Sequence, residues 1–245
     1  MPVLTERDGD VCVVTLDRPE ARNAMNAEMA AATVQALESA QECRAIVLTG
    51  RDPAFCAGLD LRQLGVERLI ELPPFVAATA ASRVPVIAAV NGPAVTGGLE
   101  LALACDFIIA SERATFADTH LRVGVYPGSV LVELPRRVGM AWAREMSLTG
   151  DFVDADTALR IGLVNHVVAH DDLLPVALAK ARAICDQDPG MVRTARRDWV
   201  ATDRLPLPDA HRLHLETATN SGFAGSTSGS IADRRADVID RAHRQ

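Results

Sequence analysis

The segment PVIAAVNGPAVTGGLELALACD, residues 85–106, decides the fold. Its apolar run at residues 86–90 leads into the turn sequence Asn91-Gly92-Pro93, and the glycine pair Gly97-Gly98 is followed at once by an apolar helical pattern. This order predicts a buried strand, a loop and then a helix over residues 99–104. The first N–H groups of such a helix have no partner within it and lie at the positive end of its dipole. The loop is therefore suited to binding developing negative charge.

Glu100 lies in the first turn of this helix, where its neighbours are otherwise apolar. Burying an ionised carboxylate without a partner costs free energy, so its presence among apolar residues calls for an explanation. Two interpretations are open. Glu100 either faces solvent and interacts with the helix dipole, or faces a pocket and acts as an acid or base.

Outward from this segment, apolar runs and helical patterns alternate along the chain. Strands are predicted at residues 3–6, 11–16, 45–49, 86–90, 107–110 and 162–168, and helices after Asn26 and at residues 99–104, 154–160, 173–185, 191–201, 209–219 and 231–243. The alternation predicts an α/β core with buried strands over residues 1–190. A helical C-terminal region is predicted over residues 191–245.

Composition excludes several classes of protein. The 245 residues are 49% hydrophobic and 23% charged, which is typical of a globular protein. The formal net charge of −7, without a block of basic residues, argues against nucleic-acid binding. Residues 84–110 are apolar, but turn residues and Glu100 interrupt them, so a membrane span is not expected. Five scattered cysteines without CxxC spacing, and no signal-peptide pattern, predict a cytoplasmic protein without a metal site.

A second candidate binding loop, AFCAGLDL at residues 54–61, follows the strand predicted at residues 45–49. Ala57-Gly58 lets a backbone approach a ligand closely, and Asp60 can cap the following turn. From these residues alone, a structural turn and a binding site are both consistent with the pattern. Cys56 has no obvious base beside it, which disfavours a nucleophilic role.

These two segments, followed by ATFADTHLRVGVYPG at residues 114–128, resemble the crotonase (enoyl-CoA hydratase/isomerase) family in order and spacing, and the resemblance extends over roughly residues 3–190. It implies a crotonase-like spiral of repeated β-β-α units. It also implies a helical C-terminal region that covers the pocket and assembles homotrimers or dimers of trimers. The implied partner is an acyl-CoA thioester, and no separate cofactor is expected because coenzyme A is part of the substrate.

The resemblance also assigns roles to residues of this chain. Ala57 and Gly97 supply the two backbone N–H groups of an oxyanion hole, which binds the thioester oxygen. The remaining implied substrate-binding residues, together with Ala57 and Gly97, are Gly58, Leu59, Asp60, Arg18, Arg22 and Arg62, of which the three arginines are candidates for contacts with the phosphates of coenzyme A.

The chain departs from the family pattern at His120. Typical hydratases of the family use two glutamates; Glu100 matches the first, and His120 stands where the second is expected. A neutral imidazole can accept a proton and an imidazolium can donate one, so His120 is either catalytic or fills the pocket structurally.

The leading hypothesis is an enoyl-CoA hydratase that adds water to a 2-enoyl-CoA through a stabilised enolate, using Glu100 assisted by His120. An enoyl-CoA isomerase or another acyl-CoA-transforming crotonase is an alternative. A non-catalytic acyl-CoA binding protein, favoured by the missing glutamate, is the alternative from a different class.

Overall fold

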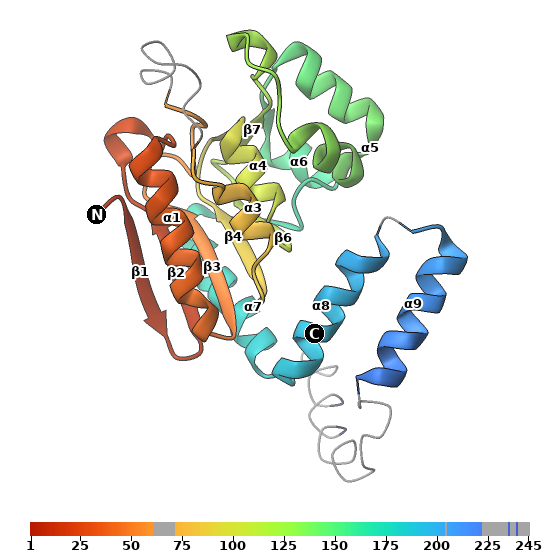
Figure 1. Ribbon diagram of the computed structural model, residues 1–245. Helices are drawn as coiled ribbons and strands as arrows, with labels where there is room; N and C mark the ends of the chain where they lie inside the picture. Colours follow the sequence, from red (N-terminus) through yellow and green to blue (C-terminus); the bar gives the residue numbers. More distant parts are fainter. Residues whose placement is uncertain (61–71, 204, 222–234, 236–238, 240–245) are drawn as a thin grey trace. The chain divides into compact units, whose positions relative to one another are not determined.

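The computed structural model describes residues 1–60, 72–203 and 205–221, together with Arg235 and Ile239 (Figure 1). The chain divides into two units, Met1–Gln187 and Asp188–Gln245. Leu61, Arg62 and most of the predicted helix at residues 231–243 lie outside the described residues. Among the described helices, none combines the length and the apolar character that crossing a bilayer requires.

A six-stranded sheet forms the centre of the first unit, in the order β1-β2-β3-β4-β6-β9. The strands β1 (Val3–Asp8) and β2 (Val11–Leu16) form the predicted antiparallel hairpin. All later neighbours pair in parallel, and their bounds are Ala45–Gly50 for β3, Val86–Val90 for β4, Phe107–Ser111 for β6 and His166–Val168 for β9. The carboxyl ends of parallel strands lie at the same edge of a sheet, so the loops that follow β3, β4 and β6 lie close together there.

Both faces of the sheet are covered, which explains why the strands are almost entirely apolar. Successive side chains of a strand point to opposite faces. In β3, Ala45 and Val47 therefore pack with helix α7 (Leu173–Cys185), while Ile46 and Leu48 belong to the larger core on the other side. That larger core includes residues of α1 (Ala27–Ser39), whose N-cap is Asn26, as predicted.

The remaining elements of the first unit surround this core. A small second sheet contains β5 (Ala94–Val95), β7 (Thr115–Ala117) and β8 (Val153–Asp154). The helices are α3 (Phe75–Ala80), α4 (Gly97–Leu103), α5 (Val130–Thr149) and α6 (Ala155–Arg160), and the short 3₁₀ turns are Pro19–Ala21, Ala40–Glu42, Leu121–Val123 and His170–Asp172. Helix α5 was not expected from the sequence.

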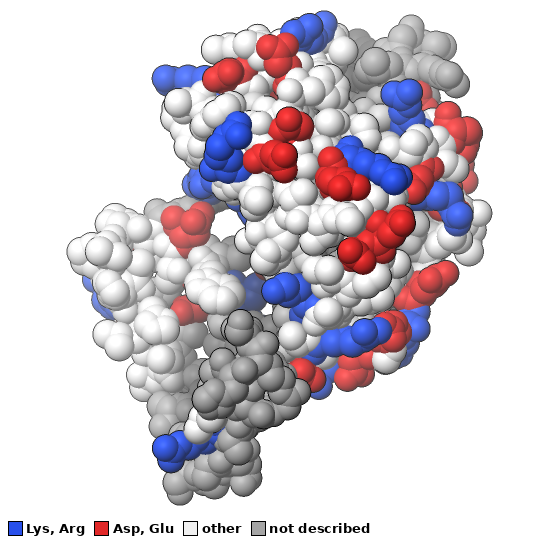
Figure 2. Space-filling model, turned by 180° about the vertical axis from the view of Figure 1, so that it is seen from behind, with Lys and Arg blue, Asp and Glu red and all other residues white. Residues whose placement is uncertain are grey.

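The second unit contains helices α8 (Pro189–Thr202) and α9 (Leu207–Asn220), which pack against each other. Both cover the helical patterns expected at residues 191–201 and 209–219. Over the described residues of the face seen in Figure 2, acidic and basic side chains are interspersed rather than gathered into one basic field.

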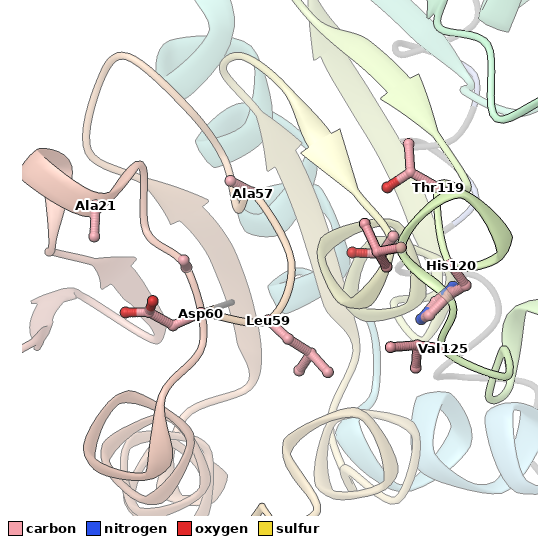
Figure 3. A pocket seen from close by; sticks show the side chains of 10 residues that line it. Ala21, Ala57, Leu59, Asp60, Thr119, His120 and Val125 are labelled. Atoms are coloured by element: carbon pink, nitrogen blue, oxygen red, sulfur yellow. The ribbon is translucent and has the colours of Figure 1, made fainter. Parts of the chain in front are cut away.

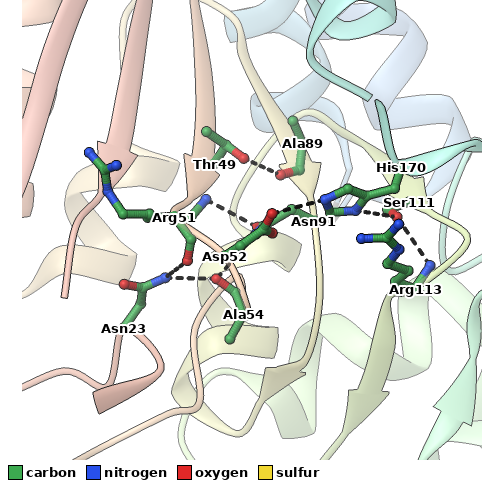
Figure 4. Close-up of polar contacts among 11 residues, drawn as sticks. Asn23, Thr49, Arg51, Asp52, Ala54, Ala89, Asn91, Ser111, Arg113 and His170 are labelled. Atoms are coloured by element: carbon green, nitrogen blue, oxygen red, sulfur yellow. Dashed lines mark hydrogen bonds and ion pairs between the residues drawn. The ribbon is translucent and has the colours of Figure 1, made fainter. Parts of the chain in front are cut away.

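A polar network joins the ends of three parallel strands (Figure 4). Asp52, after β3, accepts one hydrogen bond from Nδ2 of Asn91, after β4, at 2.8 Å, and its other carboxylate oxygen lies 3.0 Å from Nε2 of His170. The other ring nitrogen of His170 lies 3.0 Å from the hydroxyl of Ser111, the last residue of β6. Because Ser111 is fully buried, this Ser–His–Asp arrangement ties strand ends together and does not expose a nucleophile.

Candidate active site

The loop at residues 56–60 is held by backbone hydrogen bonds on both sides. On one side, Cys56 N donates to Pro93 O at 3.1 Å and Val95 N donates to Cys56 O at 3.0 Å. On the other side, Met25 N donates to Gly58 O at 2.7 Å, and Asp60 N donates to Met25 O at 2.9 Å. The loop therefore runs between the segments before α1 and before α4, and these bonds fix the directions of its other amides.

These bonds correct one residue of the predicted oxyanion hole. The amide of Ala57 donates to the carbonyl oxygen of Arg22 at 3.0 Å, so it is already engaged. The amide of Leu59, two residues on, has no acceptor in the part of the chain that the structure describes. The parallel bridge between Met25 and Leu59 is formed by the carbonyl of Gly58 and the amide of Asp60, the groups on either side of Leu59. The amide of Leu59 itself therefore points away from Met25.

Gly97 is the residue predicted to supply the second amide. It is the first residue of α4, where a helix has no internal acceptor for its N–H groups. Its Cα lies close to the other loop: a Cβ added to Gly97 would be 3.8 Å from Leu59 Cδ2 and 3.9 Å from Gly58 Cα. The amides of Leu59 and Gly97 therefore belong to adjacent backbones, and neither has an acceptor among the residues that the structure describes.

Two features of the backbone show how tightly these loops are packed. A Cβ on Gly98 would lie 2.0 Å from the carbonyl oxygen of Cys56, so this contact requires glycine. Thr96, immediately before Gly97, has φ of 48° and ψ of −111°, a conformation that residues with a side chain rarely adopt. Its amide is held by a 2.9 Å bond to Ala117 O. Such strain persists where the surroundings impose it, commonly at functional sites.

A cavity of about 280 Å³ opens beside the loop (Figure 3). The residues that line it are Ala21, Ala24, Ala57, Leu59, Asp60, Thr96, Thr119, His120, Val123 and Val125. Figure 3 shows the loop residues on one wall and Thr119, His120 and Val125 on the opposite wall. Most of these side chains are apolar, and His120 presents a titratable ring to the cavity, as a site for an acyl group with one polar reaction centre would need.

His120 is 4% exposed and is held by Asp118, a residue that sequence reasoning did not single out. Nδ1 of His120 lies 2.6 Å from Oδ1 of Asp118, and Nε2 has no partner among the described residues. The sequence feature that could have indicated this contact is a carboxylate, Asp118, two positions before the histidine that replaces a glutamate. Burial by itself raises the pKa of Asp118, but hydrogen bonds from His120 and Ser147 outweigh it and lower that pKa below 3.8.

Glu100, in α4, is buried against the first residues of α5 and does not face open solvent. Its Oε1 accepts a 3.0 Å hydrogen bond from Val130 N and a 3.2 Å bond from Ser129 Oγ. Its Oε2 has no hydrogen-bond partner among the described residues, which leaves that oxygen available to a water molecule. Glu100 lies one helical turn after Gly97, so α4 carries both the donor amide and the carboxylate.

The predicted arginines differ in their surroundings. The guanidinium of Arg18 donates to Asp60 at 2.8 Å and to Ala24 O at 3.1 Å, so it holds the loop in place. Arg22 is exposed and has no ion pair among the described residues, which leaves its side chain available for a phosphate. Within the described ranges, no group of three His, Cys, Asp or Glu side chains is arranged to hold a metal ion.

Comparisons with known proteins show the family of the chain. Residues 6–224 match the model of the enoyl-CoA hydratase/isomerase family. A probable peroxisomal enoyl-CoA hydratase of Arabidopsis thaliana is 37% identical over 220 residues, covering 86% of this chain and 82% of that protein. A probable enoyl-CoA hydratase of Rhizobium meliloti is 42% identical over 191 residues, 74% of each chain.

Solved structures lead to the same family. The crystal structure of an enoyl-CoA hydratase from Mycobacterium tuberculosis has a TM-score of 0.77 at 44% identity, covering 92% of this chain and 100% of that one. An enoyl-CoA hydratase subunit from Geobacillus kaustophilus has a TM-score of 0.88 at 30% identity, covering 97% and 95%. The chain therefore belongs to the crotonase (enoyl-CoA hydratase/isomerase) family and has its fold.

Proposed function

We propose that this protein is an enoyl-CoA hydratase, which adds water across the double bond of a 2-enoyl-CoA thioester. The observation that carries the proposal is one arrangement: the adjacent backbone amides of Leu59 and Gly97, which have no acceptor within the described ranges, lie beside a cavity that His120 lines. Enoyl-CoA hydratases recur among the relatives at 37–42% identity, which supports hydration over the other reactions of the family.

The amides of Leu59 and Gly97 bind the thioester oxygen. As water attacks the β-carbon, electrons move through the conjugated system onto this oxygen, and the two fixed N–H groups stabilise the resulting enolate. Loss of one such donor typically costs about 2.7–4 kcal/mol of transition-state stabilisation. The close packing of the two loops holds both donors in place before substrate arrives, so little reorganisation is needed during the reaction.

Glu100 and His120 handle the two protons of the addition. The free Oε2 of Glu100 accepts a proton from the attacking water, and His120 donates a proton to the α-carbon of the enolate. Glu100 then holds a proton that His120 has lost, and transfer between the two through water restores the starting state. Water supplies both the hydroxyl group and the hydrogen of the product, so the reaction is balanced without a cofactor.

The direct test is turnover of a trans-2-enoyl-CoA, followed by the loss of absorbance of its conjugated thioester. Glu100→Gln is expected to lower kcat by about 10²–10⁴-fold, because an amide cannot accept the proton of water. Glu38→Gln, at an exposed position of α1, is the matched control and keeps wild-type activity. Full activity of Glu100→Gln contradicts the mechanism.

Two other results would replace the proposed function. Conversion of a 3-enoyl-CoA to its 2-enoyl isomer, without hydration, identifies an isomerase. Tight binding of acyl-CoA thioesters without turnover, over short, medium and long acyl chains, identifies a binding protein. The same panel defines the acyl chain length that the cavity accepts.

We further propose that the protein forms homotrimers in the cytoplasm and that Arg22 contacts a phosphate of coenzyme A. Exposed apolar side chains on α8 and α9, including Trp199 (71% exposed) and Leu215 (65%), support an assembly that covers them. Five free cysteines support a reducing compartment. Light scattering after gel filtration tests the trimer, and an increased KM in Arg22→Ala, with kcat retained, tests the phosphate contact.

Dialysis against a chelator is expected to leave activity unchanged, because no cofactor beyond the substrate's own coenzyme A is needed.

A further inference from the structure

Three buried polar side chains form a chain behind the cavity: Ser147 belongs to α5, and Asp118 and His120 belong to the segment between β7 and the 3₁₀ turn Leu121–Val123. Ser147 of α5 donates its hydroxyl to Oδ2 of Asp118 at 2.6 Å. Oδ1 of Asp118 lies 2.6 Å from Nδ1 of His120 and 3.3 Å from the backbone N of the same residue. The exposed fractions are 7% for Ser147, 1% for Asp118 and 4% for His120, so water does not compete for these bonds.

The protonation of Asp118 determines which nitrogen of His120 carries hydrogen. Although burial raises the pKa of Asp118, the hydrogen bonds that it accepts hold this pKa below its usual 3.8, so the carboxyl is ionised at neutral pH. An ionised carboxylate can only accept hydrogen bonds. The hydrogen in the 2.6 Å contact therefore belongs to Nδ1 of His120. Nε2 is then the nitrogen that remains for the cavity, since it has no partner among the described residues.

We infer that Asp118 is a positioning residue for His120: it holds the ring with Nδ1–H toward itself, so that Nε2 is the atom that exchanges the proton. This inference rests on the proposed hydration. During addition, the Nε2–H bond of the imidazolium breaks, and its proton forms the new C–H bond with the electron pair of the enolate. Asp118 stays ionised throughout and balances the positive charge of the ring before the transfer, which is the role of the carboxylate beside histidine in Ser-His-Asp enzymes.

The arrangement also explains how histidine can stand where the family has a glutamate. An imidazole without a fixed partner can rotate and can carry its hydrogen on either nitrogen, which would present the cavity with the wrong atom part of the time. Asp118 removes this freedom, and Ser147 fixes the carboxylate in turn. Hydrogen bonds that orient a reacting group in this way typically contribute about 10–100-fold to activity in metal sites, where they have been measured.

The test compares Asp118→Asn, Ser147→Ala, His120→Ala and the double variant Asp118→Asn/His120→Ala in hydration of a trans-2-enoyl-CoA. Asp118→Asn is expected to lower kcat about 10–100-fold with KM nearly unchanged. Ser147→Ala is expected to have a smaller effect, because it leaves the charge and the contact with His120 in place. In the His120→Ala background, Asp118→Asn is expected to cause no further loss, since Asp118 acts through the ring. An equal loss in both backgrounds, or no loss in wild type, overturns the inference.

A second measurement does not depend on turnover. Nitrogen-15 NMR of the ring of His120, at a pH where the ring is neutral, is expected to show hydrogen on Nδ1 in the wild type and a mixture of tautomers in Asp118→Asn. Circular dichroism confirms that the variants are folded. Hydrogen on Nε2 in the wild type overturns the inference. If the wild type hydrates no enoyl-CoA, the proposed function fails, but the NMR result still decides whether Asp118 orients the ring.

Discussion

Asn23→Ala is expected to destabilise the protein strongly, because one buried side chain joins three backbone groups. Asn23 is fully buried, and its φ of 56° lies in the left-handed region. Its Oδ1 accepts a 2.8 Å bond from Arg18 N, and its Nδ2 donates to Arg51 O at 2.8 Å and Ala54 O at 2.7 Å. The last two bonds, drawn in Figure 4, connect the segment before α1 to the loop that leads into residues 56–60.

The magnitude follows from counting what the substitution removes. Each hydrogen bond contributes about 1 kcal/mol net. Ala54 O keeps a longer 3.4 Å bond from Asn91 and loses less than the others. Alanine in the left-handed region costs about 1 kcal/mol more than asparagine. The free energy of unfolding is therefore expected to fall by about 3 kcal/mol, a large part of the roughly 5–15 kcal/mol of a typical domain.

Asn26→Ala provides a matched control, because it makes the same chemical change three residues away. Asn26 caps α1 with a single 2.7 Å bond from Met29 N, so its loss is expected to cost about 1 kcal/mol. Urea unfolding followed by circular dichroism, at one protein concentration for all variants, measures both. If Asn23→Ala loses no more unfolding free energy than Asn26→Ala, the reasoning from buried hydrogen bonds is refuted.

Three further predictions concern the site and its surroundings. Gly98→Ala places a Cβ 2.0 Å from Cys56 O, so the loops must separate and kcat/KM for a 2-enoyl-CoA is expected to fall by about 100-fold; unchanged kinetics would contradict the close packing. Burial raises the pKa of Asp52, but hydrogen bonds from Asn91 and His170 outweigh it and lower that pKa below 3.8. Ionised Asp52 therefore stabilises the folded protein fully above pH 3.8, and this stabilisation is lost as pH falls through the folded-state pKa of Asp52. In urea unfolding, the free energy of unfolding of Asp52→Asn should therefore fall less with decreasing pH than that of the wild type. Burial raises the pKa of Cys56 to about 12, so iodoacetamide at pH 8 should leave it unmodified in the folded protein, as peptide mass spectrometry can check.

Much of the fold could be predicted from local patterns. The strand at residues 86–90 and the helix at residues 173–185 have the bounds that their apolar patterns indicate. The strand at residues 162–168 is shorter, since only His166–Val168 pairs with β6. Helix α5 was not predicted, because Pro135 lies within it and Gly139, with φ of 79°, interrupts the helical backbone. Packing against the core stabilises the helix at these positions, where the local helix propensity is unfavourable.

Some features of the site could likewise be predicted from the sequence, and others needed the tertiary structure. The sequence by itself determined the family, the two loops, the amide of Gly97 and the substitution of a glutamate by His120, because each is a matter of residue types in order. Only the tertiary structure decided that the amide of Ala57 is engaged by Arg22 and that of Leu59 is available, and that Asp118 holds His120. These outcomes depend on which hydrogen bonds form between segments distant in the chain, and a motif does not specify them.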